Sequence, residues 1–405
     1  MSNKLRTPPK IRVEHLFKII GDQPEKANEL LDTGASKAEI FKRTGQTAVL
    51  RDISFNANEG EIFVLTGQSG SHGSALLRCL NGLLQPTHGF VRVGSTEVTG
   101  LSDDTRRTFR QKTFGMVFRK PALLQHRTVL ENVSFGLEMK GVSKHECTLR
   151  GHAVLEVFDL AKWAETPARE LSVSMQQQVS LARAHAIDPE VLLMDEPFSE
   201  FDPPVRIRFQ EKLLALHATL GTTILFATHD LNEAVRIGDR IGIVDEEGRL
   251  VQTGAPEEIL LHPANRSVEA LLSNVDRSSV IRVESLMRPS HHVLYETKTP
   301  TDALKHMDQT STDYVFVVAS GNGLRGIVTR DRATNAAERS ATLADITRAT
   351  DITHTDRTIK EVLPHVLDSN RPIAVLNSEE QFVGEVSRSE IAKILKKQHA
   401  QPLTS

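Results

Sequence analysis

Cysteine, long apolar runs and an excess of positive charge are all scarce in this sequence of 405 residues. The two cysteines, Cys79 and Cys147, show neither a metal-binding spacing nor a disulfide framework, which favours a reducing compartment. No apolar run approaches the ~18 residues that span a bilayer, and the start, MSNKLRTPPK, lacks the apolar core of a secretory signal. The net charge of −3 gives no sign of a nucleic-acid partner. We therefore expect a soluble protein that does not bind nucleic acid.

The sequence does contain an alternation of strand-like and helical segments over most of its length, which fits two or three domains. Residues 11–45 are expected to form short helices, because QPEKANELLDTG and SKAEIFKRTG each end in a glycine stop. From Val49 onwards, apolar β-rich runs alternate with helices, a pattern typical of an α/β domain with a mostly parallel central sheet. We therefore predict a helical N-terminal extension at 1–45 and an α/β domain at 46–275. The expected helices of that domain lie at about 74–84, 103–112, 128–139, 144–160, 172–187, 204–219 and 230–237.

After Asn274 the sequence repeats a unit of helix, strand, turn, strand and helix. The segment TPTDALKHM…DYVFVVASGNGLRGIVTRDRA is echoed by RTIKEVLPHV…RPIAVLNSEEQFVGEVSRSEIA. Gly326 and Gly384, which open the last strand of each unit, are 58 residues apart. Because two such half-modules usually bury their faces against each other, we predict one paired domain at 281–400, with halves at about 281–340 and 341–400.

A glycine-rich turn joins a strand to a helix in EIFVLTGQSGSHGSALLRCL, residues 61–80. Such a turn directs backbone N–H groups and a helix N-terminus at one small volume, which suits an anion. The phosphate-binding pattern G-x-x-x-x-G-K-[ST] begins at Gly67, but His72 and Gly73 stand where glycine and lysine are expected, just before Ser74. By itself the segment is more often an ordinary turn than a phosphate site. Its interpretation therefore depends on the rest of the sequence.

Two other apolar runs end in side chains that suit a phosphate site. In VLLMDEP, Asp195 is placed to hold Mg²⁺ together with the hydroxyl of Ser74, and Glu196 could accept a proton from an attacking water. LFATHD ends in His229, which could sense a terminal phosphate by hydrogen bonding. The alternative is a strand exit with solvated acids and a structural histidine. Ionisable groups directly after buried strands, at the edge where open α/β sheets bind ligands, favour the functional interpretation.

The order of these motifs resembles that of ABC-transporter ATPases. The segments between the motifs look like the ATP-binding subunits of glycine betaine/proline (quaternary amine) importers, a subfamily with a helical N-terminal extension and a paired CBS module. The resemblance covers nearly the whole chain and implies an ABC-type nucleotide-binding domain, α/β with a P-loop sheet and a helical subdomain, followed by an α+β CBS pair. It is carried by IRVEHLFKIIGDQPEKANELL, VLRDISF, EGEIFVLTG, LLRCLNGLLQPTHG, HRTVLENVSFGLEMKGV, LMDEPFS and RIGDRIGIVDEEGRLVQTGAPEEIL.

The resemblance also implies ligands, partners and a location. These are ATP and Mg²⁺, a homodimer or heterodimer of ATPase subunits, integral membrane permease subunits and, indirectly, a solute-binding protein. The chain would lie on the cytoplasmic, inner face of the cell membrane as a peripheral subunit. Carried over by position, the resemblance implies that nucleotide is bound by Gly67, Ser69, Gly70, Gly73 and Ser74, and the metal ion by Ser74 and Asp195. It implies that the catalytic residues are Glu196 and His229, and that Ser172 and Asp202 face a partner's site.

Several positions depart from the family pattern. Loss of the lysine at 73 removes the charge that neutralises the β- and γ-phosphates, and Arg119, in place of a glutamine, puts a cation beside the expected magnesium. Arg119 or a protonated His72 could replace part of the lost charge, although side chains that merely fill an unused loop are the simpler interpretation. We expect hydrolysis to be weak or absent. The other substitutions are Ala75 for threonine, and Val173 and Ser174 for the two glycines of the signature motif, which reads LSVSMQQQ.

Two functions fit this pattern: a subunit that drives import of a betaine-like solute by closing on ATP, and a non-hydrolysing pseudo-ATPase with a structural or regulatory role. An ABC protein unconnected with transport is disfavoured, because both the extension and the CBS pair are retained. Ribose-binding CBS modules carry T-x-x-D, but here Arg332 follows Thr329 at that offset and Glu390 follows Ser387. Nucleotide binding by the CBS pair is therefore a weaker hypothesis than a structural or dimerising role.

Overall fold

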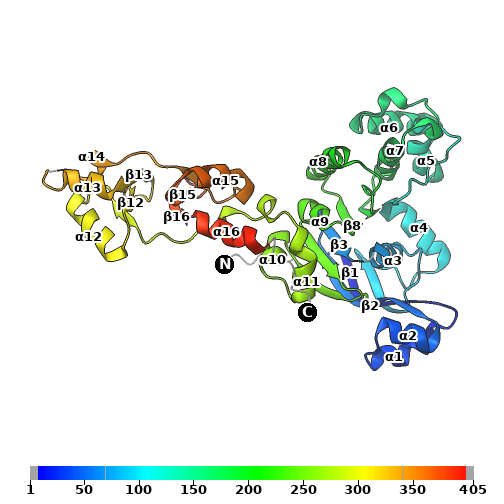
Figure 1. The fold of residues 1–405 in the computed structure, drawn as a ribbon. Coiled ribbons are helices and arrows are strands. Elements are labelled where there is room, and N and C mark those ends of the chain that lie inside the picture. Colours follow the sequence, from blue (N-terminus) through cyan, green and yellow to red (C-terminus); the bar gives the residue numbers. More distant parts are fainter. Residues whose placement is uncertain (1–7, 69, 340, 398–405) are drawn as a thin grey trace. The chain divides into compact units, whose positions relative to one another are not determined.

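The computed structural model describes residues 8–68, 70–339 and 341–397, and its contacts divide the chain into two units between Leu271 and Leu272. The first unit contains a six-stranded sheet of order β10-β9-β3-β8-β7-β6, in which only β10 and β9 are antiparallel neighbours (Figure 1). This confirms the predicted, mostly parallel central sheet. Its strands are β3 (Ile62–Gly67), β6 (Phe114–Val117), β7 (Val191–Asp195), β8 (Thr223–Thr228), β9 (Arg240–Val244) and β10 (Leu250–Gly254).

A second, four-stranded sheet has the order β2-β1-β4-β5, and its paired neighbours are antiparallel. The two sheets share one apolar core, in which Phe55 of one stacks on Phe63 of the other with ring centroids 4.7 Å apart. Leu76, Leu77 and Leu80 of helix α3 (Gly70–Leu80) are buried in the same core, which fixes α3 beside the strand that leads into it. The strands are β1 (Ile11–Ile20), β2 (Thr47–Ala57), β4 (His88–Val93) and β5 (Thr96–Glu97).

The expectation of a purely helical N-terminal extension is wrong for residues 11–20, which form strand β1 between β2 and β4. Buried side chains alternate along its first part, Ile11 and Val13, and the alternation then shifts where the pairing with β2 changes register. That shift hides the period of two that marks a strand. The two glycine-stopped helices are confirmed as α1 (Asn28–Asp32) and α2 (Lys37–Thr44). The domain boundaries at 45/46 and 275/281 remain predictions.

Helices occur where the sequence placed them, except that α3 begins and ends about four residues earlier. Helices α5, α6 and α7 pack on one another as a separate helical layer (Figure 1). Serine and threonine caps begin several helices, for example Thr128 before α5 and Ser143 before α6. The remaining helices are α4 (Asp103–Thr113), α5 (Val129–Met139), α6 (Lys144–Val157), α7 (Val173–Ala186), α8 (Pro203–Leu220), α9 (Leu231–Ile237), α10 (Pro256–Leu261) and α11 (Arg266–Leu271).

The second unit consists of the two predicted half-modules, each with a three-stranded sheet, of orders β11-β12-β13 and β14-β15-β16. In each, the first two strands are parallel and the last two are antiparallel. One apolar cluster contains side chains of both halves, including Phe316 and Phe382, so the halves share a core as expected. The elements are β11 (Val293–Tyr295), α12 (Pro300–Thr310), β12 (Tyr314–Val318), β13 (Leu324–Thr329), α13 (Arg330–Ala336), α14 (Leu343–Ile346), β14 (Ile352–His354), α15 (Ile359–Asp368), β15 (Ile373–Leu376), β16 (Phe382–Val386) and α16 (Arg388–Lys397).

The two halves also exchange the segments that lead into them. Arg288, ahead of the first half, exchanges backbone hydrogen bonds with Glu385 on the last strand of the second. Arg348, ahead of the second half, does the same with Ile327 on the last strand of the first. The repeated glycines allow this close approach, because a Cβ on Gly326 would overlap the carbonyl oxygen of Arg348 and one on Gly384 would lie 2.5 Å from that of Arg288. Gly326 and Gly384 are therefore the positions at which each half-module accepts the leading segment of the other.

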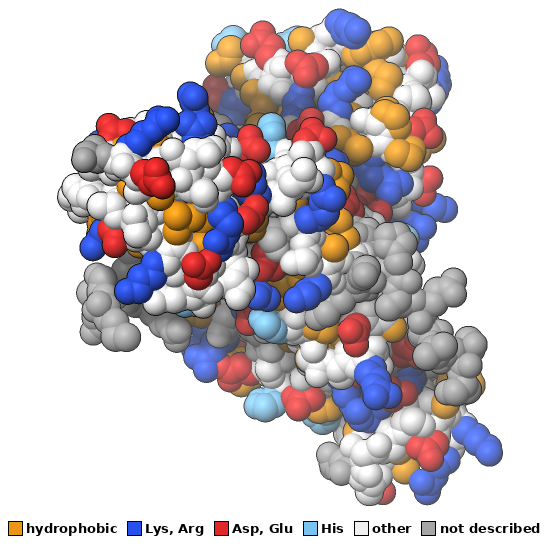
Figure 2. All heavy atoms as spheres, turned by 60° about the vertical axis from the view of Figure 1, so that its left-hand side comes forward, with side chains coloured by type: hydrophobic (Ala, Val, Ile, Leu, Met, Phe, Trp, Pro, Cys, Tyr) orange, Lys and Arg blue, Asp and Glu red, His pale blue; other side chains and the backbone are white. Residues whose placement is uncertain are grey.

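The surface carries charges of both signs. On the face in Figure 2, Lys and Arg side chains are interspersed with Asp and Glu side chains. This agrees with a net charge close to zero for a chain of this size. None of the helices in the described part of the chain is both long and apolar enough to cross a membrane.

We predict that Gly326→Ala destabilises the second unit by about 1–3 kcal/mol, because the new methyl group overlaps the passing backbone. The φ of Gly326 is +143°, which is also strained for any residue with a side chain. The matched control is Gly321→Ala, where an added Cβ meets nothing within 4 Å; its effect should stay within about 0.5 kcal/mol. Urea unfolding followed by circular dichroism measures both. Equal effects of the two variants would contradict the account.

Candidate functional site

The glycine-rich loop lies against two neighbours that leave no room for side chains. Strand β3 ends at Gly67 and α3 begins at Gly70; Ser69, between them, falls outside the described residues. A Cβ on Gly67 would overlap the carbonyl oxygen of Val244, and one on Gly70 would overlap Oε1 of Glu196. Close packing on backbone therefore requires glycine at 67, whereas a side chain at 70 would displace the carboxylate end of Glu196. They place the N-terminus of α3 next to the acidic end of β7.

Ser74 and Asp195, the predicted metal ligands, are in direct contact. The Ser74 hydroxyl donates to the carboxylate of Asp195, with 2.6 Å to Oδ1 and 2.7 Å to Oδ2. Asp195 is only 4% exposed, and this burial raises its pKa, although the hydrogen bond from Ser74 opposes the shift. The sequence thus brings two oxygen groups together from α3 and β7, as predicted for the carboxyl edge of the sheet.

Glu196, the predicted base, is buried between Arg119 and His229. Its carboxylate is 5% exposed, with Oε1 2.9 Å from Nδ1 of His229 and Oε2 3.1 Å from a guanidinium nitrogen of Arg119. The contact with Arg119 was not predicted. The sequence did contain a hint of this contact. Arg119 follows β6, which is parallel to β7, so the segments after both strands leave the same edge of the sheet. The sequence does not show, however, that the guanidinium of Arg119 extends as far as the carboxylate of Glu196.

These groups line one cavity of about 450 Å³ in the first unit. Among the described residues that line it, Arg119 is the one side chain with a permanent positive charge, and His229 adds a charge only when protonated. We call this cavity the cradle. Its lining residues are Gln68, Gly70, Ser71, Ser74, Arg119, Glu196 and His229; the sequence analysis had not included Gln68 and Ser71.

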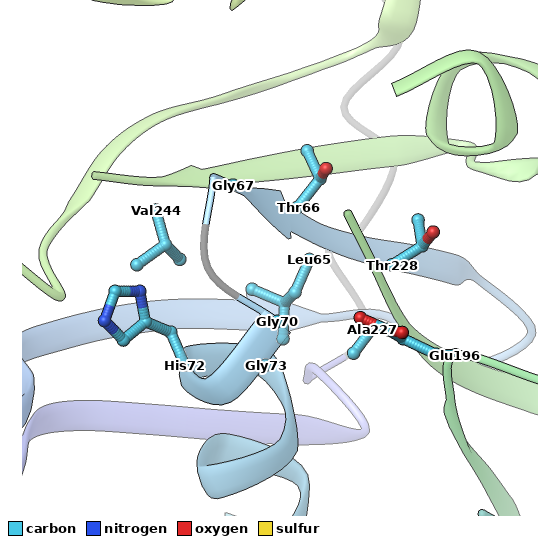
Figure 3. Close-up of a pocket in the computed structure, with 10 residues that line it drawn as sticks. All are labelled: Leu65, Thr66, Gly67, Gly70, His72, Gly73, Glu196, Ala227, Thr228 and Val244. Carbon is cyan, nitrogen blue, oxygen red and sulfur yellow. The ribbon is translucent and has the colours of Figure 1, made fainter. Parts of the chain in front are cut away.

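Gly73, at the position of the missing lysine, has no space for a side chain. A Cβ there would lie 2.8 Å from the Cβ of Ala227 on β8, closer than two such carbons approach in proteins. The enclosed cavity beside it measures about 10 Å³, which is roughly the volume that one water molecule needs. Figure 3 shows Gly73 on α3 and Ala227 on β8 among the residues that line this cavity. A lysine here therefore requires α3 or β8 to move.

His72 does not replace the lysine. Its side chain is 2% exposed and points away from Glu196, on the side of Val244 (Figure 3). Burial and the nearby cation of Lys37, whose Nζ lies 3.5 Å from Nε2, lower the pKa of His72. The imidazole is therefore neutral at neutral pH, in agreement with a side chain that fills the loop. Lys37 lies 35 residues away in the sequence, and no motif indicated this contact.

Ser172 and Asp202 are not among the side chains that line the cradle. The hydroxyl of Ser172 caps helix α7 by accepting a hydrogen bond from the backbone N–H of Met175, at 3.3 Å. Asp202 precedes α8 at its N-terminus and is exposed, and Val173 is exposed beside Ser172. Their assignment to a partner's site remains a prediction.

The residues of the cradle fit a divalent cation only in part. Ser74 and Asp195 have the oxygen ligands that Mg²⁺ prefers. At the position of the expected glutamine oxygen, however, the cavity presents the guanidinium of Arg119, which repels a metal ion. The hydroxyl of Ser74 donates its hydrogen to Asp195, which leaves the lone pairs of its oxygen available to a ligand. As arranged, the site offers oxygen ligands to magnesium but places the repelling charge of Arg119 in the same cavity.

Comparison with known proteins identifies related sequences along almost the whole chain. A family model described as ABC transporter matches residues 50–199, and one described as CBS domain matches residues 283–338. The glycine betaine transport ATP-binding protein OpuAA of Bacillus subtilis is 41% identical over 94% of this chain and 91% of its own length. The glycine betaine/proline betaine transport system ATP-binding protein ProV of Escherichia coli is 37% identical over 95% and 97%.

Solved structures agree with the fold of the first unit. A dimeric ATP-binding cassette in a post-hydrolysis state, bound to ADP and phosphate, superposes with a TM-score of 0.52 at 25% identity. The match covers 61% of this chain and 98% of that one. The structure of cbiO1 from Clostridium perfringens, part of the ABC transporter complex cbiONQ, gives a TM-score of 0.53 at 24% identity, over 64% of this chain and 93% of that one.

We predict that Gly73→Ala destabilises the first unit by about 1–3 kcal/mol through overlap with Ala227. Helix propensity alone predicts the opposite, because alanine is favoured over glycine by about 1 kcal/mol inside a helix. The matched control is the double variant Gly73→Ala with Ala227→Gly, which removes the overlap and should recover at least half of the loss. Thermal and urea unfolding measure all three chains. Stabilisation by Gly73→Ala alone would show that the loop has room for a side chain.

Proposed function

The chain belongs to the ATP-binding subunits of glycine betaine ABC transporters, and on this basis we propose that it couples nucleotide binding to an importer for glycine betaine, proline or related quaternary amines. In this role two such subunits, identical or different, would close on ATP and act on integral membrane permease subunits, with a solute-binding protein delivering the solute. The subunit would then be peripheral, on the inner face of the cell membrane. The relatives, whose names describe ATP-binding proteins of betaine transport systems, support this role.

We further propose that hydrolysis is weak or lost. The observation that carries this proposal is the close packing of Gly73 on Ala227, which leaves no room for the lysine of the family pattern. A general base must present a free carboxylate oxygen within hydrogen-bond distance of the water that it activates. Here Oε1 of the buried carboxylate of Glu196 is already engaged by His229 at 2.9 Å, and the phosphate side of the cradle lacks the lysine that stabilises charge during phosphoryl transfer.

Assembly does not restore the missing groups. In the proposed dimer each site combines the glycine loop of one subunit with the signature segment of the other. Two copies of this chain would lack the lysine and both signature glycines in each site, since Val173 and Ser174 occupy those positions. With an intact different partner, each site would still contain one altered half. The alternative function is therefore a pseudo-ATPase that keeps the fold and the permease-docking role without turnover.

For the second unit we propose a structural or regulatory role rather than ribose binding. In the first half-module, Arg332 stands where a T-x-x-D motif has its aspartate, and its side chain donates to the carbonyl oxygen of Ile346 at 2.9 Å. In the second, Glu390 accepts hydrogen bonds from the backbone N–H and the hydroxyl of Ser387 and pairs with Arg288 at 2.8 Å. Both positions are thus engaged inside the unit, and neither offers a free carboxylate to a ribose.

We predict that the purified chain releases phosphate from ATP no faster than its Glu196→Gln variant. A positive control carries the family residues through His72→Gly, Gly73→Lys, Arg119→Gln, Val173→Gly and Ser174→Gly, with Ala227→Gly to make room for the lysine. This control should be faster by on the order of 100-fold, since single electrostatic groups are worth 10²–10³ in turnover. Robust turnover by the unmodified chain that Glu196→Gln abolishes would refute the loss of hydrolysis.

A further inference from the structure

The charges that face the cradle differ from those of a metal-dependent phosphate site. The described lining residues have one permanent cation, Arg119, and one carboxylate, Glu196. Asp195 lies behind Ser74 and is engaged by its hydroxyl. The several negative charges of a polyphosphate are repelled by these two carboxylates, so a polyphosphate that binds here needs a cation beside it. The side chain in a position to supply that charge is Arg119.

Arg119 is free to change partners. Its side chain is 56% exposed, whereas that of Glu196 is 5% exposed. Oε2 of Glu196 accepts no hydrogen bond from a group in the described part of the chain, so Arg119 is held by charge rather than by a directed bond. Because the guanidinium is largely exposed, solvent and salt screen its attraction to Glu196. When Arg119 leaves, His229 still contacts Oε1 at 2.9 Å and prevents a wholly unpaired buried carboxylate.

A guanidinium suits this task well. It presents a planar fork of donors that matches two phosphate oxygens at once, and such bidentate, charge-assisted contacts are short and strong. A divalent cation, by contrast, would have to enter beside the fixed charge of Arg119, which repels it. The guanidinium of Arg119 and a divalent cation therefore compete for the same phosphate oxygens. Arg119 has the advantage that it is part of the chain and always present.

We infer that the cradle binds the phosphates of a nucleoside triphosphate without a divalent cation, with Arg119 moving from Glu196 to the phosphate oxygens. This inference rests on the proposed nucleotide-binding function and specifies its ionic requirement. Arg119 becomes the residue that determines whether the bound species is the free nucleotide or its magnesium complex. The same movement leaves Glu196 paired with His229 alone.

The experiment is isothermal titration of the full chain with ATP, once in excess EDTA and once in excess MgCl₂. We expect the two dissociation constants to agree within about threefold, because the metal adds little where Arg119 already neutralises the phosphates. Arg119→Gln should weaken ATP binding in EDTA by about tenfold or more, the loss of one charge-assisted contact. Magnesium should then restore much of the lost affinity in Arg119→Gln, because glutamine supplies an oxygen and no repelling charge.

The matched control is Arg127→Gln, which removes an ion pair with Glu138 at 2.6 Å outside the cradle; it should bind ATP like the unmodified chain under both conditions. Circular dichroism confirms that each variant is folded. Binding by the unmodified chain in magnesium but not in EDTA would overturn this inference and leave the proposed function standing. Binding in neither condition would overturn this inference and the proposed nucleotide binding together. Phosphate release tests the loss of hydrolysis separately.

Discussion

The buried carboxylate of Glu196 is the feature on which the account of the site depends. It lies at the end of strand β7, 5% exposed, between His229 and Arg119. A buried carboxylate is stable only with compensating partners, and this chain supplies them from two other segments of the same sheet edge. The pairing explains how the family's acidic residues can persist although the lysine of the glycine loop is missing.

Close backbone packing is the second constraint, and it acts in both units through glycine. Gly67 and Gly70 let the loop lie against Val244 and Glu196, and Gly73 lets α3 approach Ala227. In the second unit, the glycine at 326 admits the leading segment of the other half. At each position a side chain would overlap a neighbour. At position 73, where the family pattern has lysine, the chain thus lacks a charge and also packs its helix directly on β8.

The sequence predicted the fold class, the mostly parallel sheet, the paired C-terminal module and the convergence of Ser74, Asp195, Glu196 and His229 on one edge. These follow from strand order and from the rule that parallel strands end at the same edge. Strand β1 was taken for a helix, because its register shift interrupts the alternation of buried residues. The contacts of Arg119 with Glu196 and of Lys37 with His72 could not be predicted. They depend on where long side chains point between segments far apart in the sequence, and spacing gives no information about that.

The central claim, that Arg119 rather than a metal ion neutralises the phosphates, is tested most directly by a crystal structure of the chain with ATP in excess EDTA. The account predicts ATP in the cradle, with guanidinium nitrogens of Arg119 within hydrogen-bond distance of phosphate oxygens and His229 still on Glu196. A structure in which Arg119 remains on Glu196, and ATP enters only when magnesium is present between Ser74 and Asp195, would contradict it.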